Sequence, residues 1–384
     1  MNNDQRSTIS SSTDRRPSLS SITGTKKRPT THLHPYFPFI QSVVAAATNT
    51  SSNMTQPQKV LVTGASGMLG RSILKLLTSN KNQDKYTCVG TGLSRAEPPL
   101  VKLDLLDPSS IIKLMQDFKP NIVIHCAAER RPDRAAENPV LTKALNVTST
   151  KILAEQCERI EATMIYISTD YVFDGGIYTN ADPPYTPDSE TGPVNEYGNS
   201  KLEGEREAEA HCNNTIIVRV PVLYATDCHD LSESASLIVA QALLTPSSNE
   251  GINTRTNIRM DDWGLRFPTL VDDVASVVQL LLDAKDDLRG QSKTKTRHSC
   301  FHVSSPESCT KYKLVQLMGE IMNVDASHVQ ADSEPPVGAV RPKNTQLDCS
   351  GTWEALGIQP YEFVPLRKGM ANALEYFKGA MAIS

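Results

Sequence analysis

Short apolar runs alternate with amphipathic stretches through most of the chain. The runs are rich in β-branched residues and are bounded by polar segments, which is typical of buried strands. They cover residues 59–63, 86–91, 121–125, 164–167, 215–220 and 300–303. Between them, apolar residues recur at helical spacing; the segment 271–284, for example, places four on one face: Val274, Val277, Val278 and Leu281. The alternation predicts an α/β fold with a Rossmann-type, doubly wound parallel sheet.

The alternation lapses after Tyr224, where a polar and loop-rich stretch runs to about residue 266. The apolar helix and strand that follow predict that residues 267–305 return to the sheet. We therefore expect a Rossmann domain at 59–224. We also expect a smaller, interleaved α+β lobe, of the kind that binds a substrate, at 225–266 and 306–384.

The first 58 residues lack any such periodicity. Nineteen of them are Ser or Thr, and their six Lys/Arg outnumber two Asp/Glu. This composition favours a disordered, basic leader, because it offers too little apolar surface to offset the entropy cost of ordering. A basic, Ser-rich leader is also typical of organelle targeting, but Asp4, Asp14 and the tight cluster 26–28 make this the weaker interpretation.

The charge balance limits the partners of the remaining chain. The whole protein has a net charge of −4, and because the leader contributes +4, the body carries −8. An acidic body argues against nucleic-acid binding. The apolar run at 37–47 is too short and too interrupted to span a membrane. The eight cysteines are scattered without metal-ligand spacing, so we expect a reduced, cytoplasmic protein with no metal site.

A glycine-rich turn follows the first strand directly and opens a helix. Its spacing is G-x-x-G-x-x-G, and its residues are Gly64, Ser66, Gly67, Met68, Leu69 and Gly70 with Ala65 between the first two. In this context the glycines allow the backbone to approach a pyrophosphate, and the helix N-terminus supplies N–H groups and a positive dipole. The turn predicts a dinucleotide site.

The end of the second strand indicates which dinucleotide. An NAD site usually has Asp or Glu there, whereas this chain has Leu93, Ser94 and Arg95. Arg95 can pair with a 2′-phosphate, which favours NADP, although a solvated surface arginine would also fit. Further on, Asp104 is placed to accept a hydrogen bond from the adenine amine, while Asp107 suits the N-cap of the next helix equally well.

Tyr197 and Lys201 are four residues apart at the start of a predicted helix that runs to about residue 210. This spacing puts both side chains on one face. A nearby ammonium, together with the positive nicotinamide ring, favours phenolate. We therefore expect Lys201 and a bound nicotinamide to bring the pKa of Tyr197 toward the range in which it can act as an acid and base. Thr169, with Ser168 in reserve, ends the fourth of these strands, where it can bind a substrate carbonyl. A strand-end hydroxyl that caps backbone is the alternative.

These motifs together resemble the extended short-chain dehydrogenase/reductase family over residues 58–378. The segments 168–175 (STDYVFDG) and 341–348 (RPKNTQLD) are similar to its dTDP-4-dehydrorhamnose reductase branch. The segments 125–133 (HCAAERRPD), 260–269 and 346–350 more closely resemble the family of regulatory beta subunits of methionine adenosyltransferase.

The resemblance implies a non-catalytic subunit that binds NADP and joins a catalytic S-adenosylmethionine synthetase in a hetero-oligomer, tuning its affinity for methionine. It also implies the NADP contacts, which fall at Ser66, Gly67, Met68, Leu69, Leu93, Ser94, Arg95, Asp104, Leu105, Cys126, Arg130, Tyr197 and Leu223, with Lys201 on the ribose. The alternative is an NADPH-dependent reductase of a nucleotide-linked 4-keto sugar, with Thr169, Tyr197 and Lys201 as catalytic residues. Nothing that reduction requires is missing from the sequence, but the motifs favour the regulatory subunit.

Overall fold

The computed structural model describes residues 56–178, 182–243, 257–290 and 299–381. The predicted leader lies outside these ranges except for its last three positions. Its predicted disorder and the weaker targeting interpretation are therefore predictions still.

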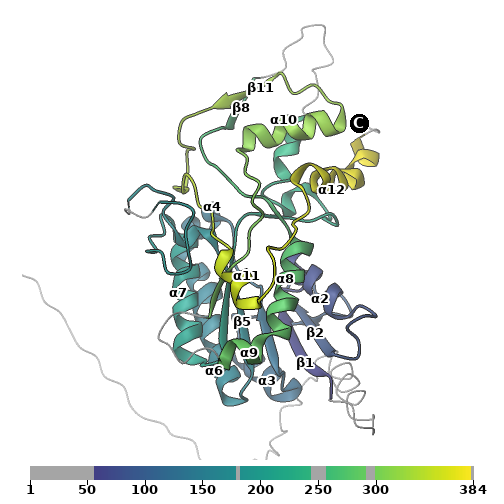
Figure 1. Ribbon diagram of the computed structural model, residues 1–384, viewed down its shortest axis with the longest axis vertical. Helices are drawn as coiled ribbons and strands as arrows, with labels where there is room; N and C mark the ends of the chain where they lie inside the picture. The colour runs from purple at the N-terminus through teal and green to yellow at the C-terminus, as the bar shows by residue number, and fades with distance from the viewer. Residues whose placement is uncertain (1–55, 179–181, 244–256, 291–298, 382–384) are drawn as a thin grey trace, which may run out of the picture.

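A seven-stranded, wholly parallel sheet forms the centre of the molecule (Figure 1). Its order is β10-β6-β5-β4-β1-β2-β3, and the direction of winding reverses between β1 and β4. The strands are β1 (Gln58–Thr63), β2 (Tyr86–Gly92), β3 (Val101–Lys102), β4 (Ile122–His125), β5 (Thr163–Thr169), β6 (Thr215–Val220) and β10 (Cys300–His302). The predicted doubly wound parallel sheet is confirmed, and each of the six apolar runs is one of its strands.

Helices cover both faces of the sheet. α2 (Met68–Leu77) and α8 (Val271–Asp283) pack together on one face. The other face carries α3 (Pro108–Phe118), α6 (Ser149–Arg159) and α7 (Glu196–His211). Shorter elements connect these: α4 (Pro132–Glu137), α5 (Pro139–Lys143), the π-helical turn η1 (Ala144–Thr148), the 3₁₀ turn η2 (Asp170–Val172) and α9 (Lys285–Gly290).

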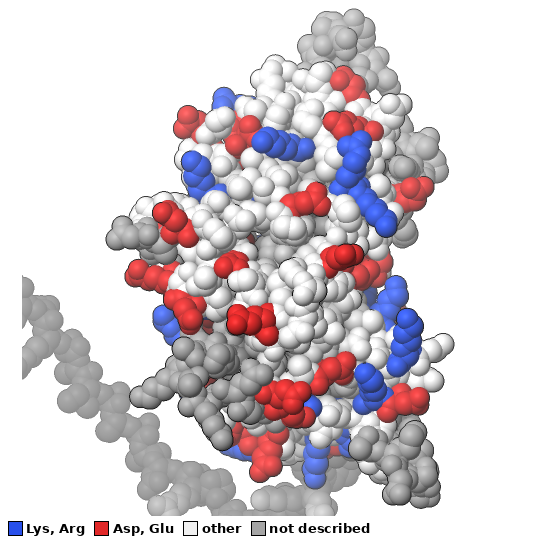
Figure 2. All heavy atoms as spheres, viewed as in Figure 1, with Lys and Arg blue, Asp and Glu red and all other residues white. Residues whose placement is uncertain are grey.

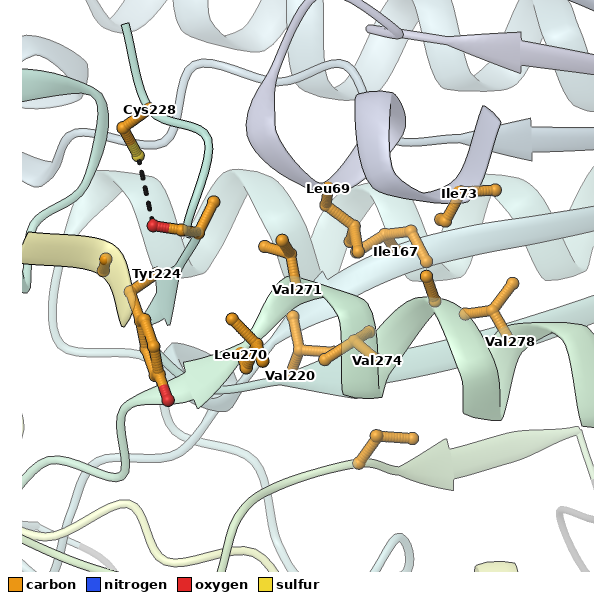
Figure 3. Packing of buried hydrophobic residues seen from close by; sticks show 14 of the residues in the cluster. Leu69, Ile73, Ile167, Val220, Tyr224, Cys228, Leu270, Val271, Val274 and Val278 are labelled. Carbon is orange, nitrogen blue, oxygen red and sulfur yellow. Dashed lines mark hydrogen bonds between the residues drawn. The ribbon is translucent and has the colours of Figure 1, made fainter. Parts of the chain in front are cut away.

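Two hydrophobic cores lie on opposite faces of the sheet, and successive residues of the central strands pack into one and then the other, because side chains alternate along a strand. In β1, Val60 and Val62 pack toward α2 and α8, whereas Leu61 packs toward α3 and α6. Both faces are covered, so the strands are apolar at consecutive positions rather than at alternate ones. Figure 3 shows the first core, in which Leu69 and Ile73 of α2 meet Val274 and Val278 of α8 over the sheet.

A smaller group of elements lies beyond the carboxyl ends of the strands, at the top of Figure 1. There β8 (Ile258–Asp261) pairs in parallel with β11 (Val329–Asp332), and α10 (Lys311–Met322) packs against η4 (Ile238–Leu243) and α12 (Leu366–Met381). A second short pair, β7 (Leu223–Tyr224) and β9 (Thr269–Leu270), joins this group to the sheet. α11 (Ser350–Leu356), within the range that the sequence assigned to the second lobe, packs against β10. The chain thus crosses between the two groups several times.

The surface carries mixed charge on the face shown in Figure 2, where acidic and basic side chains are interspersed. Within the described residues, no helix combines the length and the apolar composition needed to cross a bilayer.

A buried ion pair joins α7 to the sheet. The guanidinium of Arg219, on β6, donates to both carboxylate oxygens of Glu205 at 2.8 and 2.7 Å, and both side chains are inaccessible to solvent. Arg219 also donates to the carbonyl of Pro187 at 3.2 Å and lies 5.2 Å from the ring centroid of Phe173. One cation therefore connects a strand, a helix and the long segment between β5 and α7.

Glu205→Ala should lower the free energy of unfolding by about 3–5 kcal/mol, because it leaves a buried guanidinium without its counter-ion. Glu203→Ala, on the same helix, is the matched control: Glu203 pairs with Lys143 at 2.8 Å, but both side chains are about half exposed. We expect that control to cost about 1 kcal/mol or less. Urea denaturation monitored by circular dichroism measures both, and similar losses for the two variants would contradict the assigned role of Arg219.

Candidate functional site

The carboxyl ends of the central strands open into a cavity of about 810 Å³. Its opposite wall is formed by residues of the second group of elements, including Thr310, Lys311 and Arg341. Cavities of this size are typical of sites for small molecules and cofactors, and a point where the winding of a sheet reverses is where α/β proteins bind them. Every residue that the sequence placed in a cofactor or catalytic role lines this cavity, including Gly64, Arg95, Cys126, Tyr197 and Leu223.

The glycine turn brings backbone, not side chains, to one end of the cavity. Gly64 has φ of +66°, and a Cβ atom there would lie 2.7 Å from the backbone nitrogen of Ala127. The N-cap of α2 is Gly67, which provides no side-chain hydrogen bond to the helix. The first N–H groups of α2 therefore face the cavity without a side-chain partner, as an anion-binding helix N-terminus requires.

Arg95 lies where the sequence placed it, in the loop after β2 on the cavity wall, but it has a partner that the sequence did not reveal. Its guanidinium forms an ion pair with Glu233, in the 3₁₀ turn η3 (Leu231–Glu233). The sequence shows no carboxylate at the end of the second strand, yet the fold brings one there from 138 residues further along the chain.

The two aspartates after β3 make local contacts. Asp104 accepts from the backbone N–H of Leu106 at 2.9 Å while lining the cavity. Asp107 caps α3 by accepting from the N–H of Ser109 at 3.0 Å. The N-cap prediction for Asp107 is therefore confirmed, and the adenine contact of Asp104 stays a prediction.

Tyr197, Lys201 and Thr169 meet in the middle of the cavity. Tyr197 is in the first turn of α7, hydrogen bonds with Thr169 and packs edge-on against Tyr171, with 6.0 Å between ring centroids. Lys201 is one turn further, with its Nζ atom 3.9 Å from the ring centroid of Tyr166. Ser168 also lines the cavity, and its buried hydroxyl has no hydrogen-bond partner within the described residues.

Burial sets the charge states of Tyr197 and Lys201 in the protein by itself, and the predicted joint effect of Lys201 and a nicotinamide ring on the pKa of Tyr197 stays a prediction. Burial is the largest influence on both side chains: it raises the pKa of the Tyr197 phenol well above its usual value and lowers the pKa of the Lys201 ammonium to about 7. The Lys201 ammonium lies over the ring of Tyr166. Burial, rather than attraction between Tyr197 and Lys201, is the main influence on both pKa values. In the protein by itself, Tyr197 therefore keeps its proton at neutral pH.

His125 belongs to the same buried group, although the sequence offered no signal for its role. Its Nδ1 atom lies 2.6 Å from the Thr63 hydroxyl and its Nε2 atom 3.1 Å from the Thr150 hydroxyl. Burial, together with the charge of Lys201, lowers its pKa to about 3. A neutral imidazole therefore links β1, β4 and α6 beneath the cavity.

Basic side chains that the sequence did not single out line the wall opposite the glycine turn. Arg341 forms an ion pair with Asp133 at 2.6 Å, and Arg266 lies 5.9 Å from the ring centroid of Tyr171. Burial lowers the pKa of Lys311 nearby. Arg266 and Arg341 come from segments outside helices and strands, and Lys311 begins α10, so only the tertiary structure brings the three together.

The fold and the cavity define a class: a Rossmann-type α/β protein with a glycine-rich turn, and a tyrosine and lysine beside it. Residues 58–376 match the RmlD substrate binding domain family, and the chain belongs to this family. It is also 40% identical over 318 residues to methionine adenosyltransferase 2 subunit beta of Xenopus tropicalis, a match that covers 83% of this chain and 87% of that protein.

Solved structures of similar fold include two reductases. A dTDP-4-dehydrorhamnose reductase from Clostridium acetobutylicum is 26% identical with a TM-score of 0.66, covering 84% of this chain and all but 1% of that one. A dTDP-4-dehydrorhamnose reductase from Bacillus anthracis, solved in complex with NADP, has a TM-score of 0.65 at 22% identity over 85% of this chain and the whole of that one. At that identity the second likeness concerns the fold.

The stability of the protein should depend on pH through Lys201. Its pKa is about 7 when folded and about 10.5 when unfolded, so between these values the unfolded chain binds one more proton. The contribution of Lys201 to the free energy of unfolding therefore rises with pH across this window, by about 1 kcal/mol per unit. Urea titrations at pH 7, 8 and 9 should show this rise in the wild type and a flatter profile in Lys201→Met.

The exposed Lys75 on α2 provides the control, since Lys75→Met should leave the slope of the profile unchanged. Parallel profiles for the wild type and Lys201→Met would contradict the lowered pKa.

Proposed function

We propose that this protein is a regulatory subunit that binds NADP, joins a catalytic methionine adenosyltransferase in the cytoplasm and tunes its affinity for methionine. The observation that carries the proposal is the similarity to methionine adenosyltransferase 2 subunit beta, at 40% identity over 318 residues, or 83% of this chain. That relative is named as a subunit, so the proposal includes a catalytic partner.

Motifs of both resemblances, to the regulatory subunits and to the reductases, meet in the structure. Asp133, in the segment 125–133, pairs with Arg341, in the segment 341–348, across 208 residues of sequence. The same C-terminal segment supplies Thr345, whose hydroxyl donates to Asp170 at 2.5 Å. The motifs therefore meet at the boundary between the two groups of elements, where a bound partner or cofactor would influence both.

The cavity fits NADP by three features of its residues. The uncapped N-terminus of α2 offers N–H groups to a pyrophosphate, and Gly64 leaves the space that the turn requires. Arg95 and Arg130 line the cavity, Arg71 lies beside them through its contact with Glu233, and the three suit additional phosphate charge. Tyr197 and Lys201 lie where they can hold the nicotinamide ribose.

The regulatory proposal predicts a physical complex and a kinetic effect. The full chain should be retained by an immobilised catalytic methionine adenosyltransferase from the same organism, and its addition should lower the methionine concentration needed for half-maximal synthesis of S-adenosylmethionine. A pull-down and a methionine titration with and without the chain measure the two effects. Absence of both binding and kinetic change would exclude this function.

A second function has an observation of its own in its favour. Thr169, Tyr197 and Lys201 stand together with a protonated phenol, as reduction of a carbonyl requires. NADPH would supply the hydride, Thr169 would bind the carbonyl oxygen of a nucleotide-linked 4-keto sugar, and Tyr197 would donate the proton. Oxidation of NADPH that depends on a dTDP-4-keto-6-deoxy sugar and is abolished in Tyr197→Phe would establish this activity.

Arg95→Ala tests the choice of cofactor. If the guanidinium holds a 2′-phosphate, its loss should weaken NADP binding by about tenfold or more, because a charge-assisted hydrogen bond is removed. NAD lacks this phosphate and provides the internal control, so its affinity should change little. Calorimetric titration with each dinucleotide measures the difference, and an equal loss for both would exclude the assigned role of Arg95.

A further inference from the structure

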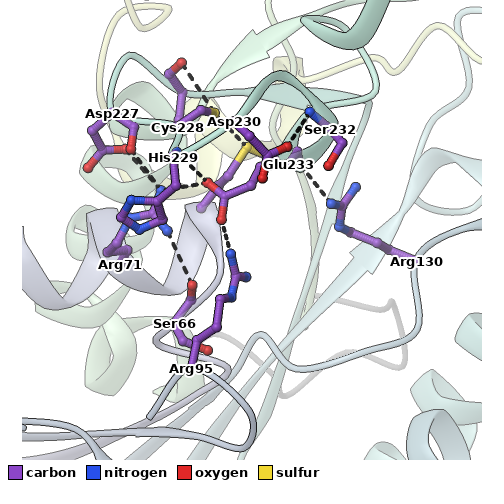
Figure 4. Close-up of polar contacts among 12 residues, drawn as sticks. Ser66, Arg71, Arg95, Arg130, Asp227, Cys228, His229, Asp230, Ser232 and Glu233 are labelled. Carbon is purple, nitrogen blue, oxygen red and sulfur yellow. Dashed lines mark hydrogen bonds and ion pairs between the residues drawn. The ribbon is translucent and has the colours of Figure 1, made fainter. Parts of the chain in front are cut away.

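Three arginines contact Glu233, whose neighbours Ser232 and Ala235 line the cavity (Figure 4). Its carboxylate forms ion pairs with Arg95 and, at 3.2 Å, with Arg71. Its backbone carbonyl accepts from Arg130 at 2.6 Å. The arginines come from α2, from the loop after β2 and from the loop after β4. Three separate segments of the Rossmann domain therefore contact one residue of η3.

The carboxylate is held firmly, whereas one of its partners is not. The Glu233 side chain is only 6% exposed and also accepts from the backbone N–H of His229 at 3.1 Å. The Arg95 side chain is 51% exposed. Asp227 offers a second carboxylate to Arg71 at 3.3 Å, but its side chain is nearly half exposed and does not reach Arg95. Glu233 is therefore the carboxylate in direct contact with Arg95.

Resting on NADP as the proposed ligand, we propose that Glu233 is a specificity-determining residue that occupies the place of the 2′-phosphate. Its carboxylate satisfies Arg95 when no such phosphate is bound. A 2′-phosphate binds by exchange: it takes over the guanidinium of Arg95, and Glu233 keeps Arg71 and the N–H of His229. The affinity for 2′-phosphorylated nucleotides is consequently lower than Arg95 alone would give, and the preference for NADP over NAD is reduced.

The segment around Glu233 also contacts the second group of elements. Ser232, Ala235 and Ser236, which flank Glu233, line the cavity. The hydroxyl of Ser234 donates to the carbonyl of Leu223 on β7, and η3 packs against η4, which in turn packs against α10. Release of Arg95 by Glu233 therefore removes one contact of a segment that lines the cavity and packs against the second group of elements.

Glu233→Gln in the full chain tests the proposal, because the amide keeps the shape of the side chain and removes its charge. The probes are adenosine 2′,5′-bisphosphate and 5′-AMP, which differ only in the 2′-phosphate. Calorimetry should show about three- to tenfold tighter binding of the bisphosphate and a change of less than about twofold for 5′-AMP. Glu97→Gln is the matched control: it removes one exposed carboxylate two residues from Arg95, outside the cavity, and should leave the ratio of the two affinities unchanged.

An unchanged ratio in Glu233→Gln, with the wild type binding the bisphosphate, would overturn the proposal and leave the proposed NADP site intact. Failure of the wild type to bind the bisphosphate or NADP would instead refute the NADP site, and the role of Glu233 with it. Should the variant not fold, hydrogen exchange on the wild type replaces it. Amide hydrogens of residues 229–234 should then exchange faster with the bisphosphate bound than with 5′-AMP bound. Equal rates with both ligands would mean that Glu233 does not release Arg95, and would overturn the proposal.

Discussion

The buried ion pair between Arg219 and Glu205 is the constraint on which the arrangement of the site depends. Two charges without access to water are tolerated only when each satisfies the other and the remaining donors find acceptors. The guanidinium meets this demand through Glu205 and the Pro187 carbonyl, and Phe173 packs against it. Because Glu205 is on α7, the pair fixes the helix that carries Tyr197 and Lys201. The positions of Tyr197 and Lys201 in the cavity therefore depend on a contact outside the cavity.

Most of the sheet and one side of the cavity could be predicted from the sequence, because both depend on local patterns. β-branched runs identified six strands, and the glycine spacing with its position after the first strand identified the turn. Tyr197 and Lys201 were found in the same way, from their spacing on one helix. These signals are carried by neighbouring residues, so they do not require knowledge of the tertiary structure.

The remaining features of the site depend on contacts between distant segments. Glu233 lies in a polar stretch without periodicity, and nothing in its neighbourhood points to Arg95. The sequence suggested that Lys201 and a nicotinamide ring act on the pKa of Tyr197, but it gave no sign that burial raises this pKa or that the ammonium lies over Tyr166. Spacing along a helix predicts which residues share a face; it does not predict how much water remains around them.

The position of β10 at the edge of the sheet affects how the nascent chain folds. β6 ends at Val220, but its neighbour β10 begins only at Cys300. Domains fold as they leave the ribosome, so β6 presents an unpaired edge while the intervening residues are translated. During that interval the edge can pair with a strand of another nascent chain. Neighbouring nascent chains on one polysome are therefore open to edge-to-edge pairing until β10 covers β6 and becomes the outer strand of the sheet.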